Sequence, residues 1–182
     1  MTRKDQSSPV EPGTTVKGAS HAGGKSRALY TAEERVRRDE SVWTLVQGVL
    51  APLQFLVFLV SLGLVLRTLT TGEGAFAADV SIVIKTLVLY TIMITGSIWE
   101  KVVFGKWLFA ESFFWEDVFS MLVLALHTLY LVLLFGGYGT LEQRMLVALA
   151  GYGAYVINAG QFIWKLRMAR LEGAHSRTAV TA

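Results

Sequence analysis

The sequence predicts an all-α integral membrane protein, a bundle of four transmembrane helices preceded by a short amphipathic helix at the membrane surface. Of its 182 residues, 53% are hydrophobic, and the apolar residues gather in four long runs. Each run is about 20 residues long, which is enough to cross a hydrocarbon core of roughly 30 Å. None of the runs alternates over about ten residues, as the strands of a membrane barrel do. The four helices are expected at residues 42–66, 80–99, 118–135 and 141–164.

Positive charge is distributed unevenly about these four runs. Fourteen of the seventeen Lys and Arg residues precede the first run, follow the last, or lie between the second and the third. Of the other three, Arg67 lies in the first connection, Arg144 lies in the first turn of the fourth run beside the third connection, and Lys85 lies within the second run. By the positive-inside rule, both termini and the central connection are therefore expected in the cytoplasm.

The ends of the chain differ from the rest in composition. Residues 1–28 are rich in Ser, Gly, Thr and Lys and show no apolar period. Disorder is expected there and in residues 172–182. Just after the first of these tails, Thr31 and Glu34 have the spacing of a capping box, which predicts a short helix. Three arginines on that helix favour a position along the lipid headgroups.

The transmembrane runs carry few polar side chains, and most of these lie in the expected cytoplasmic half. Gln47 and Gln54 are two helical turns apart and share one face of the first run. They form either a pocket wall or hydrogen bonds to neighbouring helices. Asn158 and Gln161 share one face of the fourth run at a similar depth. Lys85 lies toward the opposite end of the second run, where snorkelling to the periplasmic surface is expected rather than catalysis.

Carboxylates gather where the second and third runs meet. Glu100 ends the second run, and Glu116 and Asp117 begin the third. Glu111, in the connection, is expected to be a solvated surface charge without a role. His127 follows Glu116 by eleven residues, which places it roughly 16 Å deeper, near the bilayer midplane. Because ionisable groups inside apolar helices are functional candidates by default, this stretch is the predicted site.

The residue types present exclude several kinds of catalysis. The chain has no cysteine, so disulfides, thiolate metal sites and cysteine nucleophiles are ruled out. It also lacks a Gly-rich phosphate loop, a haem-attachment motif, a useful metal-ligand spacing and a supported Ser-His-Asp set. What remains is acid–base chemistry by carboxyl groups in an apolar, aromatic cavity. A carboxyl group held protonated there can act as a general acid.

Four segments together resemble the bacteriochlorophyllide 3-vinyl hydratase family of phototrophic bacteria. They are LYTAEER from Leu29, WTLVQGVLAPLQFLVF from Trp43, TGSIWEKVVFG from Thr95 and FFWEDVFSM from Phe113. The resemblance covers residues 29–171, the expected four-helix domain. It implies a lyase that adds water to the C3 vinyl group of chlorophyllide a, or of its bacteriochlorin counterpart, to give a 3-(1-hydroxyethyl) group.

The resemblance also implies the surroundings of this reaction. No redox cofactor is expected, and the substrate carries its own Mg²⁺. The chain would be a multi-pass protein of the bacterial cytoplasmic or intracytoplasmic membrane, active in bacteriochlorophyll biosynthesis. Its expected partners are the pigment substrate, the lipid bilayer and other pigment-biosynthesis enzymes, with no nucleic acid.

Residue roles within the predicted site are hypotheses for this substrate. Glu116 or Glu100 would protonate the terminal vinyl carbon, and Asp117 or the other glutamate would hold the attacking water. The alternative for both glutamates is salt bridging to lysines of the connection. His127 would be an axial ligand of the substrate Mg²⁺ or, alternatively, a histidine hydrogen-bonded to a neighbouring helix. The other expected substrate contacts are stacking by Trp99, Trp115 and Phe119, ion pairing of the propionate by Lys101, Lys106 or Lys165, and pocket contacts by Gln47, Gln54, Asn158 and Gln161.

The competing hypothesis is a non-catalytic membrane protein that binds a tetrapyrrole or scaffolds pigment-biosynthesis enzymes. Its polar groups would then fix the orientation of the pigment only. A transporter is less favoured, because four helices without a visible internal repeat give little to alternate. Turnover of added chlorophyllide a would separate the enzyme from the binding protein.

Overall fold

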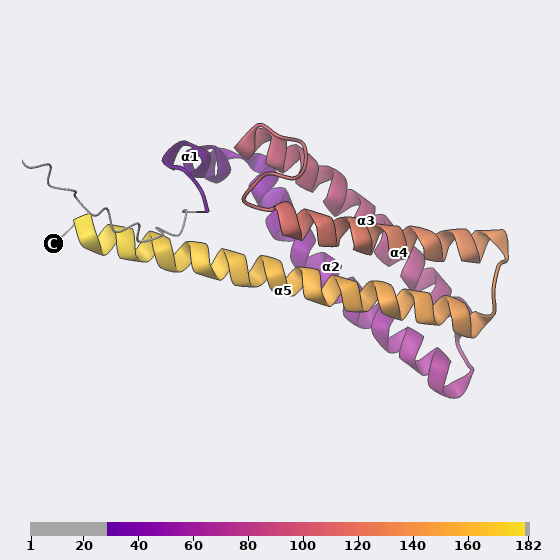
Figure 1. Cartoon of the computed structure of the whole chain (residues 1–182). Helices are drawn as coiled ribbons and strands as arrows, with labels where there is room; N and C mark the ends of the chain where they lie inside the picture. Colours follow the sequence, from indigo (N-terminus) through magenta and orange to yellow (C-terminus); the bar gives the residue numbers. More distant parts are fainter. Residues whose placement is uncertain (1–28, 181–182) are drawn as a thin grey trace, which may run out of the picture.

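The computed structural model describes the backbone of residues 29–180, with side chains described as far as Leu171. Five helices occupy this part of the chain, and no strand does. The predicted all-α fold is confirmed, and the four longer helices are each long and apolar enough to cross a membrane. The predicted disorder of residues 1–28 lies outside the described part. The helices are α1 (Ala32–Glu40), α2 (Val42–Thr71), α3 (Ala75–Phe104), α4 (Phe114–Gly136) and α5 (Leu141–Val180) (Figure 1).

The helices extend beyond the apolar runs that predicted them. α2 and α3 are both 30 residues long, because a helix can project past the hydrocarbon core for as long as its ends are capped. Gly72 and Gly105 close these two helices in the left-handed conformation, with φ of 73° and 78°, which glycine adopts without steric cost. α5 remains helical to Val180, whereas the sequence predicted an unstructured tail from residue 172.

A capping box begins α1, as predicted. Thr31 Oγ1 accepts from Glu34 N at 3.2 Å, and Thr31 N donates to Glu34 Oε2 at 2.8 Å. α1 lies against the end of α3, where Arg37 Nε donates to the carbonyl of Val103 at 2.9 Å. α1 is thereby fixed at the end of the bundle formed by residues 100–117, which we call the acidic end.

The four long helices form two antiparallel hairpins, α2 with α3 and α4 with α5, which are inclined to one another (Figure 1). Hydroxyl groups join them at mid-height. Ser61 Oγ lies 2.7 Å from Ser81 Oγ in the first hairpin and 2.5 Å from Tyr152 Oη of α5. Many large apolar side chains face outward, among them Leu56 and Val132, which are 60% and 54% exposed. A surface this apolar is disfavoured in water and supports contact with lipid.

Candidate functional site

Two carboxyl groups meet at the acidic end. Glu100, near the end of α3, and Asp117, in the first turn of α4, are 5% and 4% exposed. Their side chains lie close enough to interact with each other. Two ionised carboxylates this close together in a buried site would repel each other, which favours one proton held between them. The pair can therefore store and release one proton.

The backbone of the α3–α4 connection holds this pair in place. Phe109 N donates to Asp117 Oδ2 at 2.7 Å, and Ala110 N donates to Glu100 Oε2 at 3.3 Å. Phe109 has a φ of 58°, a left-handed conformation that is uncommon for a bulky residue and is retained where the surroundings require it. The connection is thus a structured cover over the two carboxyl groups. These donors have no sequence signal, because every residue type except proline supplies a backbone N–H.

Glu116 is the third buried acid at this end, and its partner comes from α5. Lys165 Nζ lies 2.6 Å from Glu116 Oε2, and it also lies 5.0 Å from the centroid of the Phe113 ring. The Glu116 side chain is 7% exposed and that of Lys165 is 26% exposed. A charge-assisted hydrogen bond of this length is typical of an ionised carboxylate, so Glu116 differs from the proton-sharing pair beside it. The salt bridge considered for Glu116 exists, but its lysine is not in the connection.

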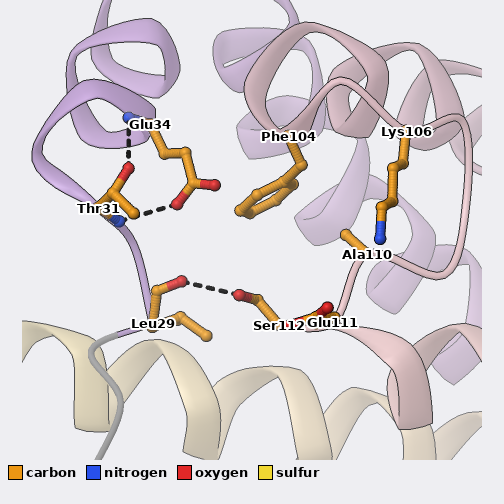
Figure 2. Close-up of a pocket in the computed structure, with 8 residues that line it drawn as sticks. All are labelled: Leu29, Thr31, Glu34, Phe104, Lys106, Ala110, Glu111 and Ser112. Carbon is orange, nitrogen blue, oxygen red and sulfur yellow. Dashed lines mark hydrogen bonds between the residues drawn. The ribbon is translucent and has the colours of Figure 1, made fainter.

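The lysines of the connection have different surroundings. Lys101 Nζ donates to the Gly105 carbonyl at 2.9 Å and so helps to close α3. Lys106 is exposed and borders a cavity of about 190 Å³ beside the connection (Figure 2). Ala110 also lines this cavity, and its N–H donates to Glu100. One residue of backbone therefore separates the cavity from the carboxyl pair. The lining residues are Leu29, Thr31, Glu34, Phe104, Lys106, Ala110, Glu111 and Ser112.

The three aromatic side chains predicted to stack on a substrate lie in different environments. Trp99 is half-buried, donates from Nε1 to Thr44 Oγ1 at 2.9 Å, and packs edge-on against Phe113 with a centroid distance of 5.6 Å. Trp115 is 65% exposed on the outer surface. Phe119 is half-buried on α4. Trp99 is thus part of an interior aromatic cluster that joins α2 to the connection.

The four predicted amides divide into two pairs. Gln47 Nε2 donates to Thr95 Oγ1 at 2.7 Å, and Asn158 Nδ2 donates to Ser120 Oγ at 2.8 Å. Both therefore contact a neighbouring helix, which for Gln47 was one of the two alternatives. Gln54 is 2% exposed, and neither its Oε1 nor its Nε2 has a hydrogen-bond partner among the described residues. The Gln161 Oε1 is likewise without a described partner.

His127 lies in the packed middle of the bundle. Its Nδ1 is 2.8 Å from the Val123 carbonyl, so Nδ1 carries the proton in the neutral ring and Nε2 is the free acceptor. Nε2 is buried and has no partner in the described part of the chain. α5 packs closely against the ring at Gly151, which has no Cβ atom. A Cβ added there would lie only 2.9 Å from His127 Cε1.

Lys85 is the clearest error of the sequence prediction. It does not snorkel to the surface: its side chain is completely buried, and Nζ lies 4.1 Å from the centroid of the Tyr155 ring. The rings of Tyr152 and Phe58 complete the enclosure at 5.4 and 5.7 Å. α3 begins at Ala75, so Lys85 is about 15 Å along the helix rather than near its end. Aromatic faces from α2 and α5 can stabilise the ammonium there by cation–π contact.

No group of three His, Cys, Asp or Glu side chains is placed to hold a metal within the described residues. Three features were not predicted from the sequence. They are the aromatic enclosure of Lys85, the backbone donors to the carboxyl pair, and the ion pair of Glu116 with Lys165 of α5. An earlier start of α3 could have been inferred from Gly72 and Gly74, which flank the turn before it. That start would have placed Lys85 in the interior.

Comparison with known proteins identifies the group to which this arrangement belongs. Curated 2-vinyl bacteriochlorophyllide hydratases from Rhodobacter capsulatus and Cereibacter sphaeroides are 67% and 68% identical over 148 and 146 residues. These alignments cover 81% and 80% of this chain, and 86% and 91% of the relatives. No solved structure matches the chain. The sequence profile of the same family matches residues 30–168, and the chain therefore belongs to the 2-vinyl bacteriochlorophyllide hydratase family.

Proposed function

We propose that Glu100 is the general acid of the hydration reaction and that Asp117 is its partner in proton transfer. As a member of its family, the chain is a hydro-lyase of bacteriochlorophyll biosynthesis. The substrate is a chlorophyllide or bacteriochlorophyllide whose ring-A vinyl group is at C3, numbered C2 in the older nomenclature of the relatives' names. The observation that carries this proposal is the pair of adjoining, buried carboxyl groups at the acidic end.

The reaction balances with these two groups alone. Glu100 transfers its proton to the terminal vinyl carbon, and the cation formed at the inner carbon is delocalised into the macrocycle. A water oxygen bonds to the inner carbon while one of the water protons passes to a carboxylate of the pair. The product carries a 1-hydroxyethyl group, and the pair again holds one proton. A low-dielectric site favours this cycle, because a neutral acid is retained until the substrate is bound.

Glu116 and Lys165 fit a second role, in which they orient the ligand and the water. The Glu116 carboxylate is adjacent in sequence to the pair and its charge is compensated by Lys165. This ionised group suits water binding better than proton donation. Lys106 is the favoured partner for the substrate propionate, because Lys101 already binds the Gly105 carbonyl and Lys165 already pairs with Glu116.

The surroundings of His127 favour the structural alternative over axial ligation of the substrate Mg²⁺. Nε2 is free to coordinate, but the ring is in contact with α5 at Gly151, which leaves no room for a macrocycle without separating the two helices. Trp99 is also a packing residue, because it belongs to the interior aromatic cluster. Trp115 and Phe119 are therefore the available stacking groups. Gln54 and Gln161 retain unpaired amide atoms, as does Asn158 at Oδ1, and these three are better candidates than Gln47 for polar contacts with the substrate.

The proposed reaction uses no redox cofactor, since hydration of a vinyl group transfers a proton and water only, and Mg²⁺ belongs to the substrate. We place the acidic end in the cytoplasm and the chain in the bacterial cytoplasmic or intracytoplasmic membrane. The excess of Lys and Arg at that end supports this orientation. We also propose that the chain contacts other enzymes of pigment biosynthesis.

One assay separates hydration from simple pigment binding. The full chain is expressed in a heterologous host, and its membranes are incubated with chlorophyllide a. Hydration shifts the red absorption band to shorter wavelength, because a vinyl group leaves the conjugated system, and adds the mass of one water. Pigment that is bound but unchanged would overturn the catalytic proposal and favour the tetrapyrrole-binding alternative.

A further inference from the structure

A groove lies between α3 and α4 near the middle of both helices. Its volume is about 320 Å³. Tyr90, Met93 and Ile94 line it from α3, and Leu124 and Thr128 line it from α4. The hairpins pair α3 with α2 and α4 with α5, so this is a place where the two hairpins adjoin rather than a contact inside one of them.

The groove opens toward the outer apolar surface. Ile94, on its rim, is 64% exposed, and Leu122, two residues before Leu124 on α4, is 47% exposed. These residues lie within helices that are long and apolar enough to span a membrane. A molecule dissolved in the bilayer could therefore reach the groove sideways, without crossing the polar acidic end.

A hydrogen-bonded tyrosine lines the groove. Tyr90 Oη lies 2.8 Å from Thr128 Oγ1, and Thr128 Oγ1 donates to the Leu124 carbonyl at 2.7 Å. The threonine hydroxyl has only one proton, so Tyr90 must be the donor in the contact between them. The tyrosine ring is thus held across the gap between the two helices.

The carboxyl pair lies further along the same two helices, toward the acidic end. Ser97 and Glu100 follow Met93 by four and seven residues on one face of α3. Asp117 precedes Leu124 by seven residues on one face of α4, where Ser120 lies between them. Seven residues of helix correspond to about 10 Å, which is comparable to the width of a tetrapyrrole ring. Because Glu100 and Asp117 touch each other, these two faces are the ones that α3 and α4 turn toward each other.

We infer that the α3–α4 groove receives the substrate macrocycle from the bilayer, with the vinyl edge directed toward Glu100 and Asp117 and the opposite edge stopped at Tyr90. This inference rests on the proposed function for the identity of the ligand. It adds a binding site, a direction of approach and a positioning residue. A lipid acyl chain or a second copy of the chain are the other occupants that the experiment must distinguish.

The test fills the groove from each side. Thr128→Trp and Ile94→Trp place a large ring in the gap, while Leu129→Trp and Leu87→Trp place the same ring on other lipid-facing positions of the same helices. The full chain is assayed with chlorophyllide a in phosphatidylglycerol vesicles. We expect both groove variants to raise KM by on the order of tenfold and both controls to stay within about twofold of the wild type. If both groove variants keep the KM of the wild type, the inference is overturned and the proposed function is unaffected.

A second measurement identifies the occupant and does not depend on turnover. A photoreactive amino acid is introduced at position 94, and separately at position 87, and the vesicles are irradiated with chlorophyllide a present. A pigment adduct at position 94 but not at 87 supports the groove, even if the wild type fails to hydrate the pigment and the proposed function is lost. An adduct to lipid only, or to a second copy of the chain, overturns the inference.

Discussion

The bundle buries ionisable groups in two regions that are built in opposite ways. At the acidic end, Glu100, Asp117 and Glu116 accept hydrogen bonds from Ala110 N, Phe109 N and Lys165 Nζ. In the middle of the bundle, Lys85 Nζ and His127 Nε2 have no hydrogen-bond partner among the described residues. Their surroundings are the Phe58, Tyr152 and Tyr155 rings near Lys85, and α5 at Gly151 near His127. We call Lys85, His127 and these three rings the amine centre.

The difference teaches how each region can function. Hydrogen bonds from the connection hold the carboxyl groups in one arrangement and still allow a proton to move between them, which suits a general acid. The amine centre is held by ring faces and close packing, so a change of volume should disturb it more than a change of charge. We therefore assign chemistry to the acidic end and structure to the amine centre, and the five predictions that follow compare the two.

The largest effect is expected from Glu100→Gln. The amide keeps an oxygen for Ala110 N but cannot deliver the proton, so turnover of chlorophyllide a should fall by about 10²–10⁴-fold, the usual contribution of a general acid. Pigment binding, measured by absorption titration, should stay within about twofold, because the shape of the site is retained. Glu111→Gln serves as the control in the connection.

The same substitution at position 116 sharpens this assignment. Glu116 is ion-paired with Lys165, so Glu116→Gln should reduce turnover clearly less than Glu100→Gln does. If Glu116→Gln is the more damaging of the two, then Glu116 is the acid, and the shared proton of Glu100 and Asp117 has a different purpose.

Much of this arrangement could be predicted from the sequence, because it depends on local pattern. Apolar runs predicted four helices, and the short connection between the second and third brought Glu100 and Asp117 to one end. The partners could not be predicted in the same way. Whether Glu116 meets Lys165 depends on the register between α4 and α5, and the donor at Phe109 depends on a backbone conformation that has no sequence signal.

Lys85 shows the same limit at the amine centre. The apolar run indicated its helix, but its depth depends on where α3 begins, beyond the apolar residues. Its neighbours come from α2 and α5, which are distant in sequence. Composition could identify a lysine within a span, whereas its environment follows only from the packing of three helices.

A second effect, on stability, is expected from Lys165→Met. Glu116 would keep its burial but lose its partner, and a buried acceptor left without a donor costs about 1–3 kcal/mol. We expect the free energy of unfolding in detergent, measured by chemical denaturation, to fall by about 2 kcal/mol. Arg167→Met, at an exposed position of the same helix, is the matched control and should change it little. Equal stability of the two variants would mean that the ion pair at the acidic end contributes nothing.

A smaller effect is expected from Gly151→Ala, which tests the packing of the amine centre. The new Cβ would lie 2.9 Å from His127 Cε1 and 3.0 Å from Nδ1, so the imidazole or the helix must shift. Overpacking of this kind costs about 1–3 kcal/mol, and we expect the lower end because only one ring must move. Gly153→Ala, with no neighbouring atom within 4 Å, should be neutral or slightly stabilising. Turnover per folded molecule should be unchanged in both, and a loss confined to Gly151→Ala would instead indicate that His127 contacts the substrate.

The smallest effect is expected from Lys85→Met, although it removes a charge from the centre of the bundle. A flexible apolar side chain of similar length can occupy the same enclosure of Phe58, Tyr152 and Tyr155. Replacing buried charge by apolar groups is often neutral or stabilising, so we expect the free energy of unfolding to change by less than about 1 kcal/mol. Turnover per folded molecule should equal that of the wild type. A large loss of turnover in a stable Lys85→Met protein would show that the amine takes part in the reaction, and chemistry could then no longer be assigned to the acidic end alone.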